Sequence, residues 1–266
     1  MRALVTSISI ILKNRYLIGV WVWKELRGKY VGSAGGWLWA VLLPLAMMGT
    51  YFFVFSIFLR VRVPYAPGIS GYFMYLMSAL LPWTAIAETL GRSTNIFFEQ
   101  AGLVQKVAFP LEVLPAYITV AALFQPLVGM TLFVGITAVI KGLNVACLAL
   151  CPVVLVFQFI FTLGFAYILS ALSVFLRDIA QGVPVFLQIW FFASPILYPE
   201  SVAPDTLQWI NKVNPLALLS DVYHGIFLRD EIMLVSLILF ALWAVVIFSV
   251  GVLIFTHLKD SVSDLV

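Results

Sequence analysis

Charge is what this sequence has least of. Only 10% of its 266 residues are Asp, Glu, Lys or Arg, whereas 63% are hydrophobic. A water-soluble domain of this size needs far more polar side chains to cover its surface, so that class is excluded. The net charge of +3 is also too small to indicate nucleic-acid binding. The mean hydropathy of +1.09 instead predicts an integral membrane protein.

Reactive groups are scarce as well. The sequence has no G-x-x-x-x-G-K-[ST] phosphate loop, no H-E-x-x-H and no G-x-S-x-G. Its two cysteines, Cys147 and Cys151, fit small apolar positions of a membrane helix. His224 and His257 are expected at opposite membrane faces, so we predict no metal site and no cofactor bound by this chain. These absences argue against a membrane enzyme, and a pore driven by another protein needs none of these groups.

Six apolar runs are long enough to cross a bilayer. The fourth exceeds what a bilayer requires, so we expect it to tilt or protrude. Between the runs we find no internal repeat. The fold class is therefore an all-α membrane protein, with residues 1–266 forming a single domain. The predicted spans are residues 36–59, 71–91, 114–140, 145–175, 182–199 and 232–256.

Basic residues predict the orientation of these spans. With the N-terminus inside, the cytoplasmic segments are residues 1–35, 92–113, 176–181 and 257–266, and they hold ten of the fifteen Lys and Arg residues. Basic residues collect on the cytoplasmic side, so both termini are expected there. No cleavable signal peptide is recognisable, and the first span is expected to guide insertion.

The N-terminal region should lie on the membrane surface. Residues 4–18 place apolar side chains on one helical face and polar ones on another, as an interfacial helix does. The stretch Trp23–Gly36 follows and carries Lys24, Arg27 and Lys29. This basic cluster is expected to remain in the cytoplasm.

The docking segment (residues 92–116) interrupts the apolar pattern between the second and third runs. Pro110 and Pro115 each stand where a helix can begin, so we expect a short helix, a break and a restart. Such a helix suits docking into a groove of a soluble partner, although a plain cytoplasmic connection fits the same pattern. Glu88 and Arg92 are four residues apart, which predicts an ion pair on one helix face.

Residues 194–231 are too apolar for an ordinary loop and too interrupted for a span. Asp205 and Gln208 form a capping-box pattern that starts a short helix. Asn214 and Pro215 suit the N-cap and first position of a second helix. Two short amphipathic helices could form a re-entrant lid, or could merely cover the outer leaflet.

Four stretches together carry a family resemblance. They are KELRGKYVGSAGGWLWAVLLPLAMM at 24–48, NIFFEQAGLVQKVAFPLEVLP at 95–115, SVFLRDIAQ at 173–181, and SPILYPES with WINKVNPLA at 194–217. In their order and spacing the chain resembles the membrane-spanning subunit of ABC-2 type polysaccharide exporters, which serve O-antigen, capsule and teichoic acid. The resemblance implies a permease in the bacterial cytoplasmic membrane that exports a lipid-linked polysaccharide.

The same resemblance assigns roles to particular residues. A coupling helix facing the ATPase would use Gln105, Lys106, Val107, Phe109 and Glu112. Lys24, Arg27 and Lys29 would meet the diphosphate of the lipid-linked sugar, or serve only as a cytoplasmic anchor. The channel-lining aromatics would be Trp37, Trp39, Tyr51, Phe52, Phe55, Trp190 and Phe191, unless these rings simply pack. An outer gate would include Tyr198, Trp209, Asn214, Pro215 and Tyr223.

The resemblance also implies partners. Two copies of the chain would form a homodimer, and each would bind a cytoplasmic ABC ATPase subunit that holds the ATP and Mg. The substrate would be an undecaprenyl-diphosphate-linked glycan within the lipid bilayer, with no nucleic acid involved. Two other readings stay open, namely an ABC-2 exporter of drugs or small lipids and a membrane scaffold that recruits a cytoplasmic partner.

Overall fold

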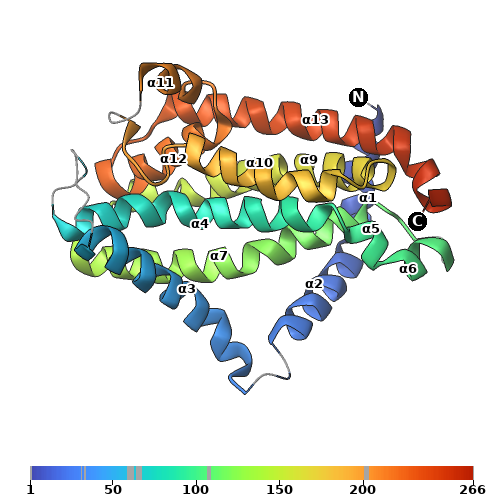
Figure 1. Ribbon diagram of the computed structural model, residues 1–266, viewed down its shortest axis with the longest axis horizontal. Coiled ribbons are helices and arrows are strands. Elements are labelled where there is room, and N and C mark those ends of the chain that lie inside the picture. The colour runs from blue at the N-terminus through green and yellow to red at the C-terminus, as the bar shows by residue number, and fades with distance from the viewer. Residues whose placement is uncertain are drawn as a thin grey trace.

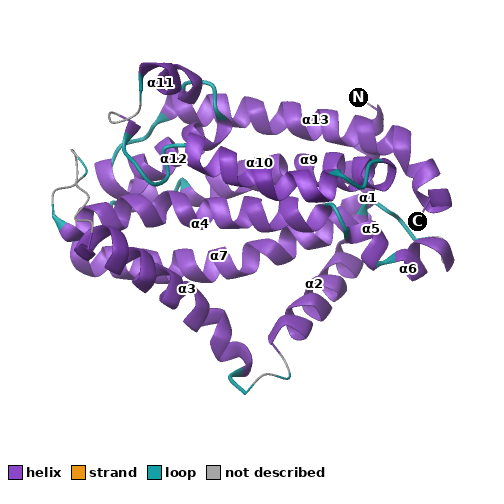
Figure 2. Cartoon of the chain, in the orientation of Figure 1, coloured by secondary structure: helices purple, strands orange, loops and turns teal. Residues whose placement is uncertain are grey.

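The computed structural model describes residues 2–30, 32, 34–58, 63, 68–106, 109–200 and 204–265. Helices joined by short loops make up this part of the chain, and no strand is drawn in it (Figure 2). The elements are α1 (Arg2–Lys13), α2 (Arg15–Tyr30), η1 (Gly36–Leu38), α3 (Trp39–Tyr51), η2 (Phe52–Phe58), α4 (Ile69–Ser93), α5 (Ile96–Glu99), α6 (Ala101–Lys106), α7 (Val113–Ile140), α8 (Val145–Leu148), α9 (Cys151–Phe175), α10 (Ile179–Ala193), α11 (Asp205–Asn211), α12 (Pro215–His224), η4 (Gly225–Arg229) and α13 (Leu234–Leu265).

Five helical stretches in the described residues are long and apolar enough to cross a membrane, which makes this a multi-pass membrane protein. Five of the predicted runs correspond to these stretches, although residue 59 of the first run lies outside the described residues. The stretches are Gly36–Phe58, Ser70–Ser93, Val113–Ile140, Val145–Phe175 and Leu234–Lys259.

The sixth predicted run, residues 182–199, differs from the structure. Its helix α10 begins earlier, at Ile179, and ends at Ala193 after 15 residues. Fifteen residues of helix rise about 22 Å, which is less than the ~30 Å hydrocarbon core. The remaining residues of the run, from Ser194 on, turn back, and Tyr72 and Tyr75 of α4 donate hydrogen bonds to their carbonyl oxygens.

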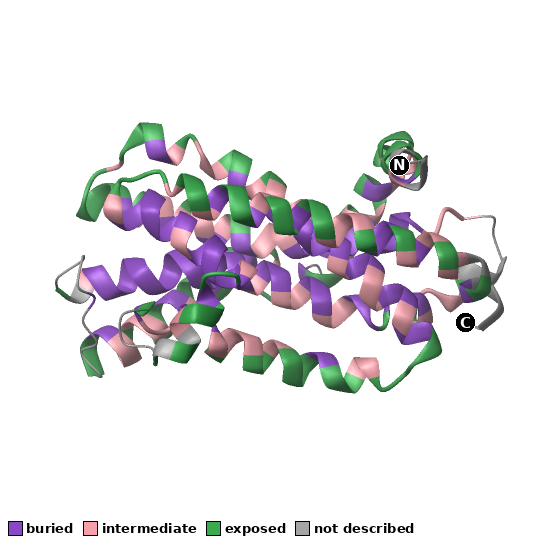
Figure 3. Cartoon of the chain, turned by 90° about the horizontal axis from the view of Figure 1, so that it is seen from above, coloured by how far each residue is buried: buried purple, intermediate pink, exposed green. Residues whose placement is uncertain are grey.

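Helix α4 is the centre of the bundle. Of its span-length window, 83% is buried inside the chain, against 17–28% for the other four candidate spans. It packs against α7, α9, α10 and α12 (Figures 1 and 3). The other spans therefore turn much of their apolar surface outward, as helices in contact with lipid or with another subunit do.

The bundle has two distinct ends. We call the end that carries α11 and α12, on the left in Figure 1, the lid end. We call the opposite end, on the right, the basic end; it carries α5, α6 and both chain termini. Helices α2 and α3 diverge from the bundle and approach each other again at Tyr30 and Gly36, forming a V below it. Trp23 and Trp37 stack across this V with ring centroids 5.5 Å apart.

Helices α9 and α13 form the closest pair in the bundle. Gly164 of α9 lies directly against Gly251 and the backbone of Phe248 on α13. A side-chain carbon on Gly164 would lie 2.6 Å from the Phe248 backbone nitrogen, so only glycine fits there. Small residues at such a crossing let two membrane helices approach closely and pack tightly.

The predicted boundary of the N-terminal helix was wrong. The N-terminal helix was expected over residues 4–18, but α1 ends at Lys13 and α2 runs from Arg15 to Tyr30. The basic residues Lys24, Arg27 and Lys29 consequently stand on a helix. At the other terminus, the predicted span of residues 232–256 corresponds to Leu234–Lys259, and α13 itself continues to Leu265.

Candidate functional site

A two-rung ladder of ion pairs joins α2 to α4. Lys29 Nζ lies 3.1 Å from Glu88 Oε1, and Arg92 lies 2.9 Å from Glu25 Oε1. The partners on each helix are four residues apart, so both rungs lie on facing surfaces. Glu88 and Arg92 were expected to pair with each other along α4, and this prediction was wrong because each has a partner on α2.

The three cations of the basic cluster on α2, Lys24, Arg27 and Lys29, do not form one group. Lys24 lies over the ring of Trp21 at 4.4 Å, and Arg27 lies over Trp23 at 5.4 Å. Lys29 faces α4 and the Glu88 carboxylate. All three are exposed, which leaves Lys24 and Arg27, one turn apart, as the pair best placed to meet an anion together.

We expect the ladder to tolerate exchange of its charges. Arg92→Glu should lower the melting temperature of the detergent-solubilised protein slightly, because partly exposed ion pairs contribute less than about 1 kcal/mol. Glu25→Arg combined with Arg92→Glu restores opposite charges and should recover most of the loss. If the double variant is no more stable than Arg92→Glu alone, the rung contributes nothing.

The docking segment consists of two short helices, α5 and α6, followed by an irregular connection to α7. Phe109 is half-buried and packs edge-on against Trp21 of α2, with centroids 6.2 Å apart. Gln105 and Lys106 stand on α6, but the description does not extend to their side chains, and Val107 lies outside the described residues. The structure thus gives the predicted short helix, break and restart.

Glu112 lies away from the surface of this segment. Its side chain is only 6% exposed, and Lys259 Nζ of α13 lies 3.1 Å from its Oε1. Tyr167 of α9 donates a hydrogen bond to the Glu112 carbonyl oxygen at 3.3 Å. Glu112 therefore contacts this chain's own helices, and we leave it out of the surface offered to a partner.

The predicted channel aromatics fall into separate places. Trp37 and Trp39 lie where α3 meets α2, whereas Tyr51, Phe52 and Phe55 lie at the far end of the same span. On α10, Trp190 and Phe191 pack against Trp83 of α4. Helix α4 separates α10 from α3, so these aromatics line no common wall within one chain (Figure 1).

Asn214 organises the lid end. Its Oδ1 accepts hydrogen bonds from Trp190 Nε1 at 2.9 Å and from the backbone N–H of Leu216 at 3.1 Å, and its Nδ2 donates to Ser194 Oγ at 2.9 Å. The predicted N-cap at Asn214, with Pro215 at the first helical position, is confirmed. The bond to Trp190 was not foreseen, and it ties α12 to α10.

The first lid helix was predicted less accurately. Helix α11 begins at Asp205, but the residue at its N-cap position is Pro204, and the Pro204 side chain forms no capping hydrogen bond. Trp209 is 69% exposed, with Lys212 Nζ over its ring at 3.8 Å. Tyr198 donates to the Phe192 carbonyl oxygen at 2.9 Å, which holds the connecting loop against α10.

The lid reaches deep into the bundle. Tyr223 of α12 is fully buried and donates to Gln158 Oε1 at 3.1 Å, while Gln158 Nε2 donates to the Pro82 carbonyl oxygen, halfway along α4. Trp243 lies about 14 Å along α13 from the start of that helix, and its indole N–H donates to the Val213 carbonyl oxygen. These contacts join the segment around α12 to α4, α9 and α13. Gln158 was not singled out from the sequence, although a lone amide in so apolar a run is the signal that could have found it.

His224 lies on α12, outside the five candidate spans, and was expected at the membrane interface. The structure instead buries it, with the ring stacked on Tyr75 at 4.0 Å and Nε2 3.0 Å from the Tyr75 carbonyl oxygen. Burial lowers the pKa of His224 to about 4, so the ring is neutral at neutral pH. Within the described part of the chain, His, Cys, Asp and Glu side chains do not gather into a metal site.

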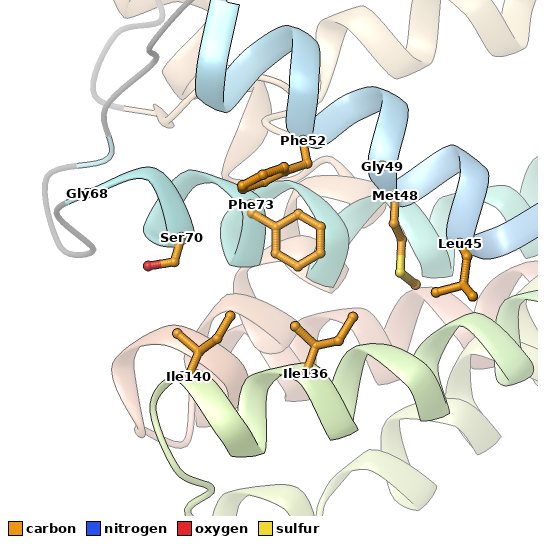
Figure 4. Close-up of a pocket in the computed structure, with 9 residues that line it drawn as sticks. All are labelled: Leu45, Met48, Gly49, Phe52, Gly68, Ser70, Phe73, Ile136 and Ile140. Carbon is orange, nitrogen blue, oxygen red and sulfur yellow. The ribbon is translucent and has the colours of Figure 1, made fainter.

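An apolar cavity of about 780 Å³ lies between α3, α4 and α7 towards the lid end (Figure 4). Met48 and Phe52 form one wall, Phe73 another, and Ile136 and Ile140 the third. Among the described residues that line it, Ser70 at the rim carries the one polar side chain. Such a cavity can accommodate hydrocarbon, whereas a sugar or diphosphate would lack hydrogen-bond partners there.

Comparison with known proteins identifies a family and three similar proteins. The family described as ABC-2 type transporter matches residues 16–228. An O-antigen export system permease protein RfbA of Myxococcus xanthus is 32% identical over 213 residues, covering 79% of this chain and 80% of that protein. Two proteins of the same name from Klebsiella pneumoniae are 28% and 27% identical, each over 89% of both chains. The match extends from α2 to η4 and so includes the ladder, the docking segment and the lid, and the chain belongs to the ABC-2 type transporter family.

Proposed function

We propose that this chain is the membrane-spanning permease subunit of an ATP-driven exporter of lipid-linked polysaccharide. The similarity to three O-antigen export permeases over 79–89% of the chain carries this proposal. None of these three similar proteins is named as a drug exporter, a small-lipid exporter or a scaffold, the rival classes raised from the sequence. The substrate that best fits is an O-antigen-like glycan on undecaprenyl diphosphate.

The energy would come from a separate ABC ATPase, which would hold the ATP and Mg. We place its contact at the docking segment, on Gln105, Lys106, Val107 and the adjoining Phe109. The support is positional, because α5 and α6 extend from the basic end together with both termini (Figure 1). With the excess of basic residues on that side, the same end would face the cytoplasm of a bacterial cell, and the spans would cross its inner membrane.

A homodimer would complete the channel. Helix α10 exposes Val185, Phe186, Ile189 and Phe192, whereas η1 exposes Trp37 and α3 exposes Trp39 and Leu43. One chain cannot bring these faces together, since α4 stands between them. A second copy could place its α3 opposite α10, so that the aromatics of both helices line one passage for sugar rings.

The two ends would serve arrival and exit of the substrate. At the V between α2 and α3, Lys24 and Arg27 are exposed beside Trp21 and Trp23 and could bind the diphosphate. At the opposite end, Tyr198, Trp209, Asn214, Pro215 and Tyr223 belong to the lid that would open for the glycan. The apolar cavity between α3, α4 and α7 suits a lipid chain and not the sugar.

Reconstitution of the chain with its ATPase in proteoliposomes tests this function. We expect undecaprenyl-diphosphate-linked O-antigen glycan to stimulate ATP hydrolysis and to become accessible to a glycosidase on the opposite side. Stimulation by drugs or short lipids alone would favour the drug or small-lipid exporter. An ATPase that binds but never responds to glycan would favour the scaffold.

We expect Lys106→Glu to abolish co-purification of the ATPase while leaving insertion and melting temperature unchanged. The reason is that reversing a charge at an interface costs affinity through like-charge contacts. Lys106→Arg, which keeps the charge, is the matched control. Unchanged co-purification of Lys106→Glu would move the ATPase contact away from α6.

A further inference from the structure

The last helix extends beyond the membrane. Helix α13 has 32 residues, a rise of about 48 Å, and its apolar span ends at Lys259. The extension is nevertheless packed, since its Val262 is fully buried, as is Phe255 two turns earlier at the end of the span. Both belong to a cluster that also contains Leu103 and Phe109 of the docking segment. The C-terminal helix therefore contacts the segment proposed to meet the ATPase.

The docking segment is fixed to a different helix at each end. At its start, Arg92 pairs with Glu25 of α2. Near its end, Glu112 pairs with Lys259 of α13, and this carboxylate is only 6% exposed. Removing one member of a poorly exposed ion pair is strongly destabilising, so the Lys259 contact holds this end of the docking segment against α13.

The opposite end of α13 contacts the lid. Trp243 donates to the Val213 carbonyl oxygen at 2.9 Å, just before α12, and Ser236 Oγ donates to Asp221 of α12 at 2.6 Å. Between these ends, α13 is held against α9 by the Gly164–Gly251 crossing. Close packing of this kind has low compressibility and transmits strain, so a displacement at one end of α13 can reach the other end.

We propose that Glu112 and Lys259 are positioning residues that make α13 follow the docking segment, so that movement of the ATPase reaches the lid through α13. The inference rests on the proposed function and adds a route to it. The ion pair fixes the docking segment to α13, and the contacts of Trp243 and Ser236 pass the displacement of α13 to α12.

A double variant in which both members of the ion pair are replaced by neutral residues separates a positioning role from a stabilising one. Lys259→Met alone leaves a buried, unpaired carboxylate and should destabilise the protein. Glu112→Gln combined with Lys259→Met removes both charges, so this double variant should keep the wild-type melting temperature and still co-purify with the ATPase. Lys259→Arg retains the pair, and His257→Gln changes an exposed side chain of the same helical turn.

The measurement is glycan transported per ATP hydrolysed, in proteoliposomes containing the complete complex and undecaprenyl-diphosphate-linked O-antigen glycan. We expect the neutral double variant to hydrolyse ATP but to export at least about fivefold fewer glycans per ATP. A factor of about five is the lower end of the range usual for coupling between distant sites. The Lys259→Arg and His257→Gln complexes should behave as wild type.

A neutral double variant with the wild-type ratio would overturn the inference while leaving the proposed function in place. A double variant that fails to bind the ATPase would also overturn it, because the pair would then support docking and not transmission. A wild-type complex that neither exports glycan nor responds to it would overturn both proposals.

Discussion

We expect Gly251→Ala and Gly164→Ala to be the most destabilising single-methyl changes in this chain. A side-chain carbon at Gly164 would lie 2.6 Å from the Phe248 backbone nitrogen, and one at Gly251 would lie 3.0 Å from the Gly164 carbonyl carbon. The obstructing atoms are backbone, so no rotamer change can relieve the clash and the two helices must separate. Overpacking typically costs about 1–3 kcal/mol, and these variants should reach or exceed the top of that range.

The melting temperature of the detergent-solubilised protein measures this effect. Gly135→Ala is the matched control, because that glycine is exposed on α7 and nothing lies within 4 Å of the added carbon. It should melt as wild type or slightly higher, since alanine favours helix. The double variant at residues 164 and 251 should cost less than the two single changes summed, because the first alanine already separates the helices. A Gly164→Ala protein as stable as Gly135→Ala would contradict the close crossing.

The elements predicted well from sequence are those whose cause is local. Long apolar runs identify the five candidate spans because a bilayer imposes their length. Asn214 and Pro215 were assigned to a helix start because the capping bond reaches only to Leu216. The buried face of α12, with Leu216, Leu219 and Tyr223, likewise follows from helical spacing.

Three of the errors come from partners distant in sequence. The run to residue 199 is apolar enough to continue α10, but Pro195 and Leu197 are held by tyrosines more than a hundred residues away. Helix α13 continues past the polar Lys259, whose ammonium group forms an ion pair with the Glu112 carboxylate. Glu88 pairs with Lys29 and not with Arg92, a choice that spacing along one helix cannot reveal.

The candidate site shows the same division. Residue types with a local signal, such as the basic cluster of α2 and the lid asparagine, were found. Trp190 was assigned to a channel by resemblance, yet its indole N–H is bonded to Asn214, so its ring orientation depends on the lid. Gln158 was missed because its two partners, Pro82 and Tyr223, come from separate elements.

Two asparagines three residues apart should respond to substitution in opposite ways. Asn214 is 7% exposed, and both polar atoms of its side chain are hydrogen-bonded. Asn214→Ala removes an N-cap, worth about 1 kcal/mol, and leaves the indole N–H of Trp190 and the hydroxyl of Ser194 without this partner. The Ser194 hydroxyl still donates to the Trp190 carbonyl oxygen, so only the indole N–H is orphaned, at about 1–3 kcal/mol. We therefore expect a total loss of about 3 kcal/mol and an impaired lid.

Asn211 is 3% exposed, but neither polar atom of its side chain has a hydrogen-bond partner among the described residues. Asn211→Leu, which is similar in size, removes two buried polar atoms at no cost in hydrogen bonds, so the melting temperature should stay the same or rise.

Asn214→Ser separates the two roles of Asn214, because serine keeps the N-cap acceptor but is too short to reach Trp190. It should fall between wild type and Asn214→Ala in melting temperature, while its glycan export should be as low as that of Asn214→Ala if the bond to α10 holds the lid. Export at the wild-type level by Asn214→Ser would mean that capping of α12, and not the contact with α10, is what the lid requires.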